Sequence, residues 1–285
     1  KPEECRKILE NLGFLTSYNV RKAIFKIVVP SIRLRDIVIP EDIVEEIARI
    51  YGYHHLPNNL PPMVYVQQPK EVEQLFETQK RIKHFLKHLG LHESMNYSMV
   101  SQELIENMNL EIKHHLRLAN TISEELQYMR TSLLPSLVRN IRENQGKVDV
   151  LRFFEIAKVY YPQEKELPKE IYKVALATNT SFMDLKGITE ALLNELKIEN
   201  YELRAAKIHI FSKKEVIDFV LNGSVFGSIG KLSTQLQHKN NLKSAVYLAS
   251  FDLISLMNHA KIISQYKPIN PYATIKLDLN VKTGK

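Results

Sequence analysis

Prolines cluster between positions 57 and 69 and limit what this segment of the chain can form. The segment contains Pro57, Pro61, Pro62 and Pro69. Proline has no backbone N–H and a fixed φ angle, so neither a helix interior nor a central strand can run through several of them. Proline-rich segments are instead extended and semi-rigid. We therefore expect two folded parts, joined by a linker over residues 57–69.

The composition is that of a globular protein. Of the 285 residues, 44% are hydrophobic and 25% are charged, which is ordinary for a folded chain. No apolar run reaches the roughly 18 residues of a membrane span, and no signal peptide opens the chain. The single Cys5 excludes an internal disulfide and fits a reducing compartment, so we expect a cytoplasmic protein.

The charge and the two ends of the chain add two expectations. The net charge of +7 permits an acidic partner such as RNA, but it is a modest excess. The chain begins without methionine and stops at Lys285 within a strand-like stretch. We therefore expect it to be a piece of a longer protein.

The N-terminal part predicts a helix, a strand and a second helix. Lys1 to Phe14 carries apolar residues at helical spacing. The segment that follows, as far as Tyr18, predicts a turn. Ile24 to Val29 is rich in β-branched residues and predicts a strand. Pro40 suits the first turn of the second helix, and Gly52 suits its end.

Four carboxylates lie at the start of the second helix: Asp36, Asp42, Glu45 and Glu46. One interpretation is capping, because Asp42 and Glu45 are spaced as an acidic capping box and the helix dipole stabilises acids in a first turn. The other is a Mg²⁺ site. Positions i, i+3 and i+4 share one helix face, Asp36 can approach from the preceding loop, and Mg²⁺ prefers oxygen ligands. The residues alone leave both interpretations open.

Glu71 to Leu89 predicts a long amphipathic helix. Its apolar stripe consists of Val72, Leu75, Phe76, Ile82, Phe85, Leu86 and Leu89. The stripe faces either the core of the same chain or another subunit. His84 and His88 lie one turn apart on this helix, but a zinc site needs at least a third protein ligand, so we interpret them as surface histidines.

The remainder predicts strands with a few helices. Strands are expected at Leu91–Val100, Val148–Tyr161, Tyr172–Thr178 and, in succession, over His209–Phe251. Helices are expected at Leu134–Asn144 and from Phe182 onward. Asn222 and Gly223 predict a hairpin turn. The chain has no G-x-x-x-x-G-K-[ST] or G-x-G-x-x-G loop to hold a phosphate.

Several segments resemble the beta subunit of phenylalanyl-tRNA synthetase. VPSIR (29–33) and DIVEEIARIYGY (42–53) resemble the family's Val-Pro-Ser-x-Arg-x-Asp-Ile and Asp-Leu-Ile-Glu-Glu-Ile-Ala-Arg-Ile-Tyr-Gly-Tyr. Two residues, instead of the family's one, separate Arg33 from Asp36. LRLANTISEELQYMRTSLLP (116–135) resembles a second family segment, which ends in [Leu/Met]-Arg-Thr-Ser-Leu-[Leu/Val]-Pro. FMDLKG (182–187) resembles the family's Phe-x-Asp-Leu-Lys-Gly.

The resemblance implies an α+β fold in which a small helix–strand–helix domain precedes a class II synthetase-like antiparallel sheet flanked by helices. It implies that residues 1–56 form the family's fifth domain, which is winged-helix-like. It also implies that residues 70–266 form an inactive, catalytic-like module and that residues 267–285 begin a truncated, ferredoxin-like anticodon-binding domain. The family's Mg²⁺ ligands correspond to Asp36, Asp42, Glu45 and Glu46.

The resemblance also implies a function in the ATP-dependent attachment of phenylalanine to its tRNA. An alpha subunit would perform the reaction and use the ATP, in a heterotetramer of two alpha and two beta chains. The present chain would scaffold the complex and contact the alpha subunit and tRNA.

The resemblance places Arg130 in a region comparable to that of the ATP-binding arginine of active class II enzymes, but within MRTSLLP and without a glycine-rich amino-acid pocket, so we assign no catalytic residue. The alternative function is a non-enzymatic RNA- or protein-interaction module on the same fold. A neighbouring reading frame for an alpha subunit would distinguish the two.

Overall fold

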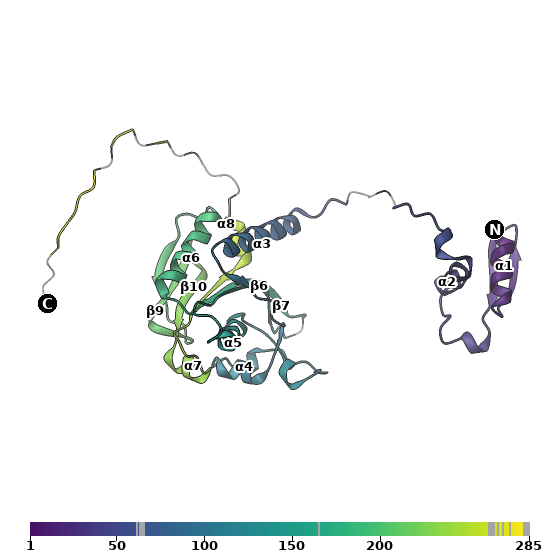
Figure 1. Cartoon of the computed structure of the whole chain (residues 1–285), viewed down its shortest axis with the longest axis horizontal. Helices are drawn as coiled ribbons and strands as arrows, with labels where there is room; N and C mark the ends of the chain where they lie inside the picture. Colours follow the sequence, from purple (N-terminus) through teal and green to yellow (C-terminus); the bar gives the residue numbers. More distant parts are fainter. Residues whose placement is uncertain are drawn as a thin grey trace. The chain divides into compact units, whose positions relative to one another are not determined.

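The computed structural model describes residues 1–60, 62, 66–164, 166–261, 266, 268–269, 271–273 and 275–281. The chain divides into two compact units, Lys1–Gln67 and Gln68–Lys285 (Figure 1). The division falls within the segment predicted as a linker. Among the described residues, no helix is long and apolar enough to cross a membrane.

The first unit is a helix, a β-hairpin and a second helix. Its elements are α1 (Pro2–Asn11), β1 (Leu15–Asn19), β2 (Ile24–Val28), the 3₁₀ turn η1 (Ser31–Arg33), α2 (Pro40–Tyr51) and the 3₁₀ turn η2 (Tyr53–His55). Its buried apolar side chains are those of Leu9, Phe14 and Ile37. Partly buried residues of β2 and α2 pack around them, so a small core joins α1, β2 and α2.

The prediction of a turn up to Tyr18 is wrong, because β1 occupies that position. β1 pairs antiparallel with β2 along its whole length, from Leu15 opposite Val28 to Asn19 opposite Ile24. Its sequence LTSYN is half polar and does not by itself indicate a strand. Cross-strand contacts with β2 stabilise it in this conformation. The unit is therefore helix–hairpin–helix and not helix–strand–helix.

The second unit is built on a seven-stranded sheet of order β3-β6-β7-β11-β10-β9-β8. The strands are β3 (His92–Glu93), β6 (Arg152–Tyr161), β7 (Lys169–Thr178), β8 (Glu202–Ala205), β9 (Phe211–Leu221), β10 (Ser224–Leu232) and β11 (Tyr247–Asp252). All pairs are antiparallel except β3 with β6. The turn between β9 and β10 has Asn222 and Gly223 at positive φ, as their sequence predicts. The mixed α+β fold with a mostly antiparallel sheet is confirmed.

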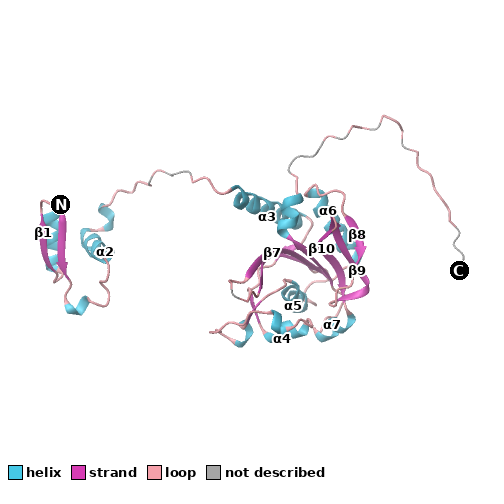
Figure 2. Cartoon of the chain, turned by 180° about the vertical axis from the view of Figure 1, so that it is seen from behind, coloured by secondary structure: helices cyan, strands magenta, loops and turns pink. Residues whose placement is uncertain are grey.

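Helices cover both faces of this sheet. One face packs against α3 (Lys70–His88), α6 (Phe182–Glu195) and α8 (Leu253–His259), and the other against α5 (Leu134–Asn144) and α7 (Thr234–Lys239). Figure 2 shows the two sets of helices on opposite sides of the strands. Central strand β7 is buried on both sides: Val174 and Leu176 enter one core, and Ala175 and Ala177 enter the other. This follows from the two-residue period of a strand.

Three expectations for the second unit need correction. Leu91–Val100 is not one strand: β3 pairs with β6, whereas β4 (Met99–Val100) pairs with β5 (Tyr128–Met129), because the chain turns away between them. His209–Phe251 is interrupted by helix α7, whose N-terminus the Ser233 hydroxyl caps. The described residues 275–281, expected to open a strand, belong to no strand. The unit also contains α4 (Gln102–Asn107) and the 3₁₀ turns η3 (Ile112–His114) and η4 (Glu124–Leu126).

Candidate functional site

Asp42, one of the four acids of the predicted metal site, caps helix α2. Its Oδ2 accepts hydrogen bonds from the backbone N–H groups of Val38 at 2.7 Å and Ile39 at 2.9 Å. Ile39 is the N-cap residue and has extended backbone, and Pro40 opens the helix. These two N–H donors hold the pKa of Asp42 below its usual range. Asp42 therefore has a capping role, but the predicted capping box of Asp42 and Glu45 is wrong, because Asp42 is the third helical residue and bonds the backbone of the N-cap residue Ile39.

Glu46 is buried and lies between two arginines. Arg33 donates to its Oε1 at 2.8 Å and Arg49 donates to its Oε2 at 2.7 Å, while Arg33 also contacts Asp36 Oδ2 at 2.7 Å. Hydrogen bonds from Arg33 and then from Arg49 lower the pKa of Glu46. Bonds to Glu46 and Asp36 raise the pKa of Arg33. The Glu46 charge is thus stabilised from within the chain.

The four predicted ligands do not gather around one point. Asp42 is engaged with the backbone, Asp36 and Glu46 are engaged with Arg33, and Glu45 is exposed. Nowhere in the described ranges do three His, Cys, Asp or Glu side chains form a group that could hold a metal ion. This arrangement does not fit Mg²⁺, so the ion stays a prediction without support from the side-chain geometry.

Arg130, the residue compared above with an ATP-binding arginine, is enclosed in the second unit. It is 3% exposed and donates from Nη1 to Glu155 Oε1 at 2.7 Å and from Nε to the Lys158 carbonyl at 3.0 Å. Asn96 Nδ2 donates to the other Glu155 oxygen at 2.8 Å. An arginine clamps a phosphate only if its donors are free. Arg130 instead joins the segment before β4 to strand β6.

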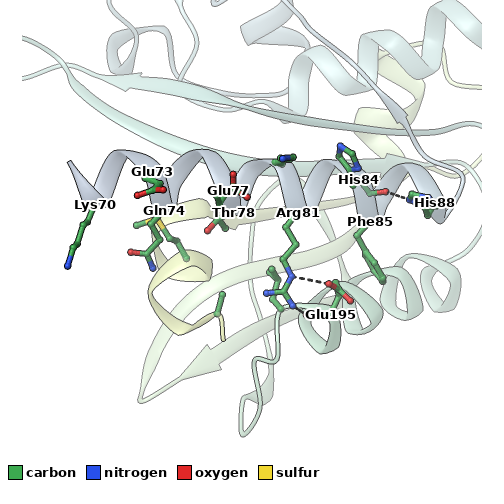
Figure 3. A pocket seen from close by; sticks show the side chains of 14 residues that line it. Lys70, Glu73, Gln74, Glu77, Thr78, Arg81, His84, Phe85, His88 and Glu195 are labelled. Atoms are coloured by element: carbon green, nitrogen blue, oxygen red, sulfur yellow. Dashed lines mark hydrogen bonds and ion pairs between the residues drawn. The ribbon is translucent and has the colours of Figure 1, made fainter. Parts of the chain in front are cut away.

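A groove of about 950 Å³ runs along α3 and is lined also by residues from the ends of α6 and α8 (Figure 3). Arg81 crosses it and donates to Glu195 Oε1 at 2.9 Å, to the Glu195 carbonyl, and to the Lys261 carbonyl at 2.9 Å. It thereby satisfies carbonyl groups that helix C-termini leave open. His88 Nδ1 lies 2.6 Å from the His84 carbonyl, so this pair is part of the helix surface.

The sequence motif points to the four acids but not to the arginines that pair with them. In the sequence, Arg33 and Arg49 stand out only as members of a family motif, and Glu155 only as a residue of a predicted strand. Their ion pairs were not predicted. One signal was available for Glu155. A carboxylate within the apolar run RFFEIA is expected to have a buried partner, because an unpaired charge is costly to bury.

The fold of this chain is similar to that of two solved tRNA synthetase structures. It resembles the crystal structure of pyrrolysyl-tRNA synthetase from Desulfitobacterium hafniense, with a TM-score of 0.55 and 17% sequence identity over 64% of this chain and 68% of that one. A second structure, described as Desulfitobacterium hafniense PylSc, a pyrrolysyl tRNA synthetase, also gives a TM-score of 0.55, at 16% identity over 68% of this chain and 78% of that one.

Two family models match in succession along the chain. The model of the tRNA synthetase B5 domain matches residues 1–53, and the model of the phenylalanyl tRNA synthetase beta chain CLM domain matches residues 56–253. The chain therefore belongs to the family of phenylalanyl-tRNA synthetase beta chains.

Relatives with the name phenylalanine–tRNA ligase beta subunit match almost the whole chain. The protein of Geobacillus kaustophilus is 30% identical over 99% of this chain and 37% of its own length. That of Clostridium acetobutylicum is 27% identical over 98% of this chain and 36% of its own length. The chain thus spans a little over a third of these relatives.

Proposed function

We propose that this chain is the part of a phenylalanine–tRNA ligase beta subunit that supports the ATP-dependent attachment of phenylalanine to tRNA without performing it. The successive B5 and beta-chain CLM matches support the subunit assignment. In this proposal an alpha subunit binds ATP and carries out the reaction, in a cytoplasmic heterotetramer of two alpha and two beta chains. The present chain is a scaffold that also contacts tRNA.

The enclosure of Arg130 is the observation that carries the second half of this proposal. Its guanidinium lies in the interior, bonded to Glu155, and both faces of the adjoining sheet are filled by the side chains of helices. A catalytic site that stabilises a reacting phosphate needs donors aimed at the place where charge develops. Here the corresponding donor is used to hold the fold together.

Helix α3 supplies the surface that we assign to the alpha subunit. Ile82 and Leu86 are fully buried in the core of their own unit, so part of the predicted stripe is internal. Phe76 is 65% exposed and Val72 is 37% exposed, four residues earlier on the same helix face. An exposed aromatic side chain beside an aliphatic one is the type of anchor that protein interfaces bury.

Pyrophosphate exchange with phenylalanine and ATP tests the proposal. The purified chain alone is expected to give no exchange above background. The expected partner is the alpha subunit from the same organism, and the two should co-purify as one complex. Robust exchange by the chain alone would show that it has its own active site. Failure of the two chains to associate would favour the alternative of an independent interaction module.

A further inference from the structure

Arg33 lies between two carboxylates that come from different elements of the first unit. Its guanidinium is 2.7 Å from Asp36 Oδ2, in the loop before α2, and 2.8 Å from Glu46 Oε1, within α2. Its centre also lies 5.9 Å from the centroid of the buried Phe14 ring. One positive group therefore connects the loop, the helix and the core, in the place where the family resemblance implied a divalent cation.

The spacing of Arg33 and Asp36 makes this arrangement possible. The chain forms a tight turn there, in which the Arg33 carbonyl accepts hydrogen bonds from the Ile37 N–H at 3.0 Å and from the Asp36 N–H at 3.3 Å. In such a turn, residues three apart lie on the same side and residues two apart do not. With the single intervening residue of the family segment, the two side chains would point apart. The additional residue of this chain brings them together.

We propose that the Arg33 guanidinium takes the place of the divalent cation at this junction, so that the first unit keeps its structure without Mg²⁺. A guanidinium has five donors in a planar fork and can connect two carboxylates at once. Arg49 neutralises the remaining oxygen of Glu46 at 2.7 Å. An ion entering here would have to displace both arginines from a carboxylate whose side chain is only 9% exposed, leaving their charges without partners.

The other two predicted ligands do not change this conclusion. Asp42 accepts two backbone hydrogen bonds, and its loss to a metal would uncap α2. Glu45 is exposed and would contribute only one carboxylate. Mg²⁺ demands near-ideal octahedral geometry and usually keeps several waters, so one free carboxylate does not define a site for it.

Hydrogen–deuterium exchange of the whole chain, followed on peptides from residues 31–51, tests the proposal. Exchange is measured with 5 mM MgCl₂ and with excess EDTA, on the wild-type chain and on Arg33→Met. The matched control is Arg35→Met, because Arg35 is exposed and lies in the same turn. Methionine keeps an unbranched side chain and removes only the charge and its donors.

Wild-type exchange is expected to be the same with Mg²⁺ and with EDTA. Arg33→Met should accelerate exchange in these peptides by about tenfold, because it leaves Glu46 and Asp36 without their shared partner, whereas Arg35→Met should change nothing. Protection of the wild-type peptides by Mg²⁺ would overturn the proposal, and so would equal exchange by the two variants. The wild-type comparison decides the question even if Arg33→Met does not fold. No alpha subunit, ATP or tRNA is present, so the outcome is independent of the proposed function.

Discussion

At the scale of single residues, each unit contains a buried or half-buried arginine that connects elements within that unit. Arg33 does so in the first unit and Arg130 in the second, each through a carboxylate from another element. Such pairs gain little net free energy over an apolar core, but removing one partner is costly because the other charge stays buried. The cost depends on exposure: Arg130 and Glu155 are 3% and 2% exposed, whereas Asp36 faces solvent.

Glu155→Gln is expected to lower the free energy of unfolding by about 3–5 kcal/mol, because the charge of Arg130 then stays buried without its counterion. Urea unfolding followed by circular dichroism measures the change. The control compares Arg130→Met and Glu155→Leu, each made alone, with the variant that carries both changes. The double variant has neither charge, so its loss in the free energy of unfolding should be much smaller than the sum of the two single losses. Strictly additive losses would show that the ion pair is not coupled.

His115 gives the second unit a dependence on acid pH. It is buried, its Nδ1 lies 3.0 Å from the Glu111 carbonyl and its Nε2 lies 2.9 Å from Thr131 Oγ1. Burial lowers its pKa below the usual 6.5, so the unfolded chain binds a proton at higher pH than the folded one. The stabilisation is therefore complete above about pH 6.5 and is lost as the pH falls below it. The urea concentration at the midpoint of unfolding should decrease when the pH is lowered from 7.5 to 5.5. The decrease should be smaller for His115→Gln.

At the scale of helices and strands, periodic elements were predictable and short ones were not. The bounds of α5 agree with the prediction, and α3 is shifted by one residue. Both helices are long enough for their apolar residues to show the helical period clearly. Helix α7 was missed because its six residues are too few to show a helical period. β1 and the division between β3 and β4 were missed because their pairing partners lie in other segments and leave no period in the local sequence. For the same reason the acids around Glu46 were identified without Arg33, which lies thirteen residues away.

Gly227 in strand β10 is required by the ring of Phe251 on neighbouring strand β11. A Cβ atom added at Gly227 would lie 1.9 Å from Phe251 Cδ1, so Gly227→Ala must displace a side chain that is 1% exposed. We expect a loss of roughly 1–3 kcal/mol in the free energy of unfolding. Gly187→Ala is the matched control: nothing lies within 4 Å in helix α6, and alanine there should stabilise by about 0.5–1 kcal/mol. Equal effects of the two changes would contradict this explanation.

At the scale of the whole molecule, each unit buries its own core, and the second unit leaves part of α3 without a partner. Leu75 and Phe85 of the predicted stripe pack against the core of the second unit, so they belong to its folding. Phe76 contributes little to that core and is available for assembly. A change at Phe76 should therefore separate assembly from folding, which a change at Leu86 cannot do.

Phe76→Asp is expected to weaken association with the alpha subunit by at least tenfold and to leave the thermal unfolding midpoint of the isolated chain unchanged. The reason is that a charge would be placed where an aromatic anchor is buried in the complex, while in the free chain it would meet water. Leu86→Asp serves as the contrast, because Leu86 is fully buried and a charge there should unfold the second unit. Association is measured by sedimentation velocity with the purified alpha subunit. Wild-type affinity of Phe76→Asp would place the subunit contact on another surface of the chain.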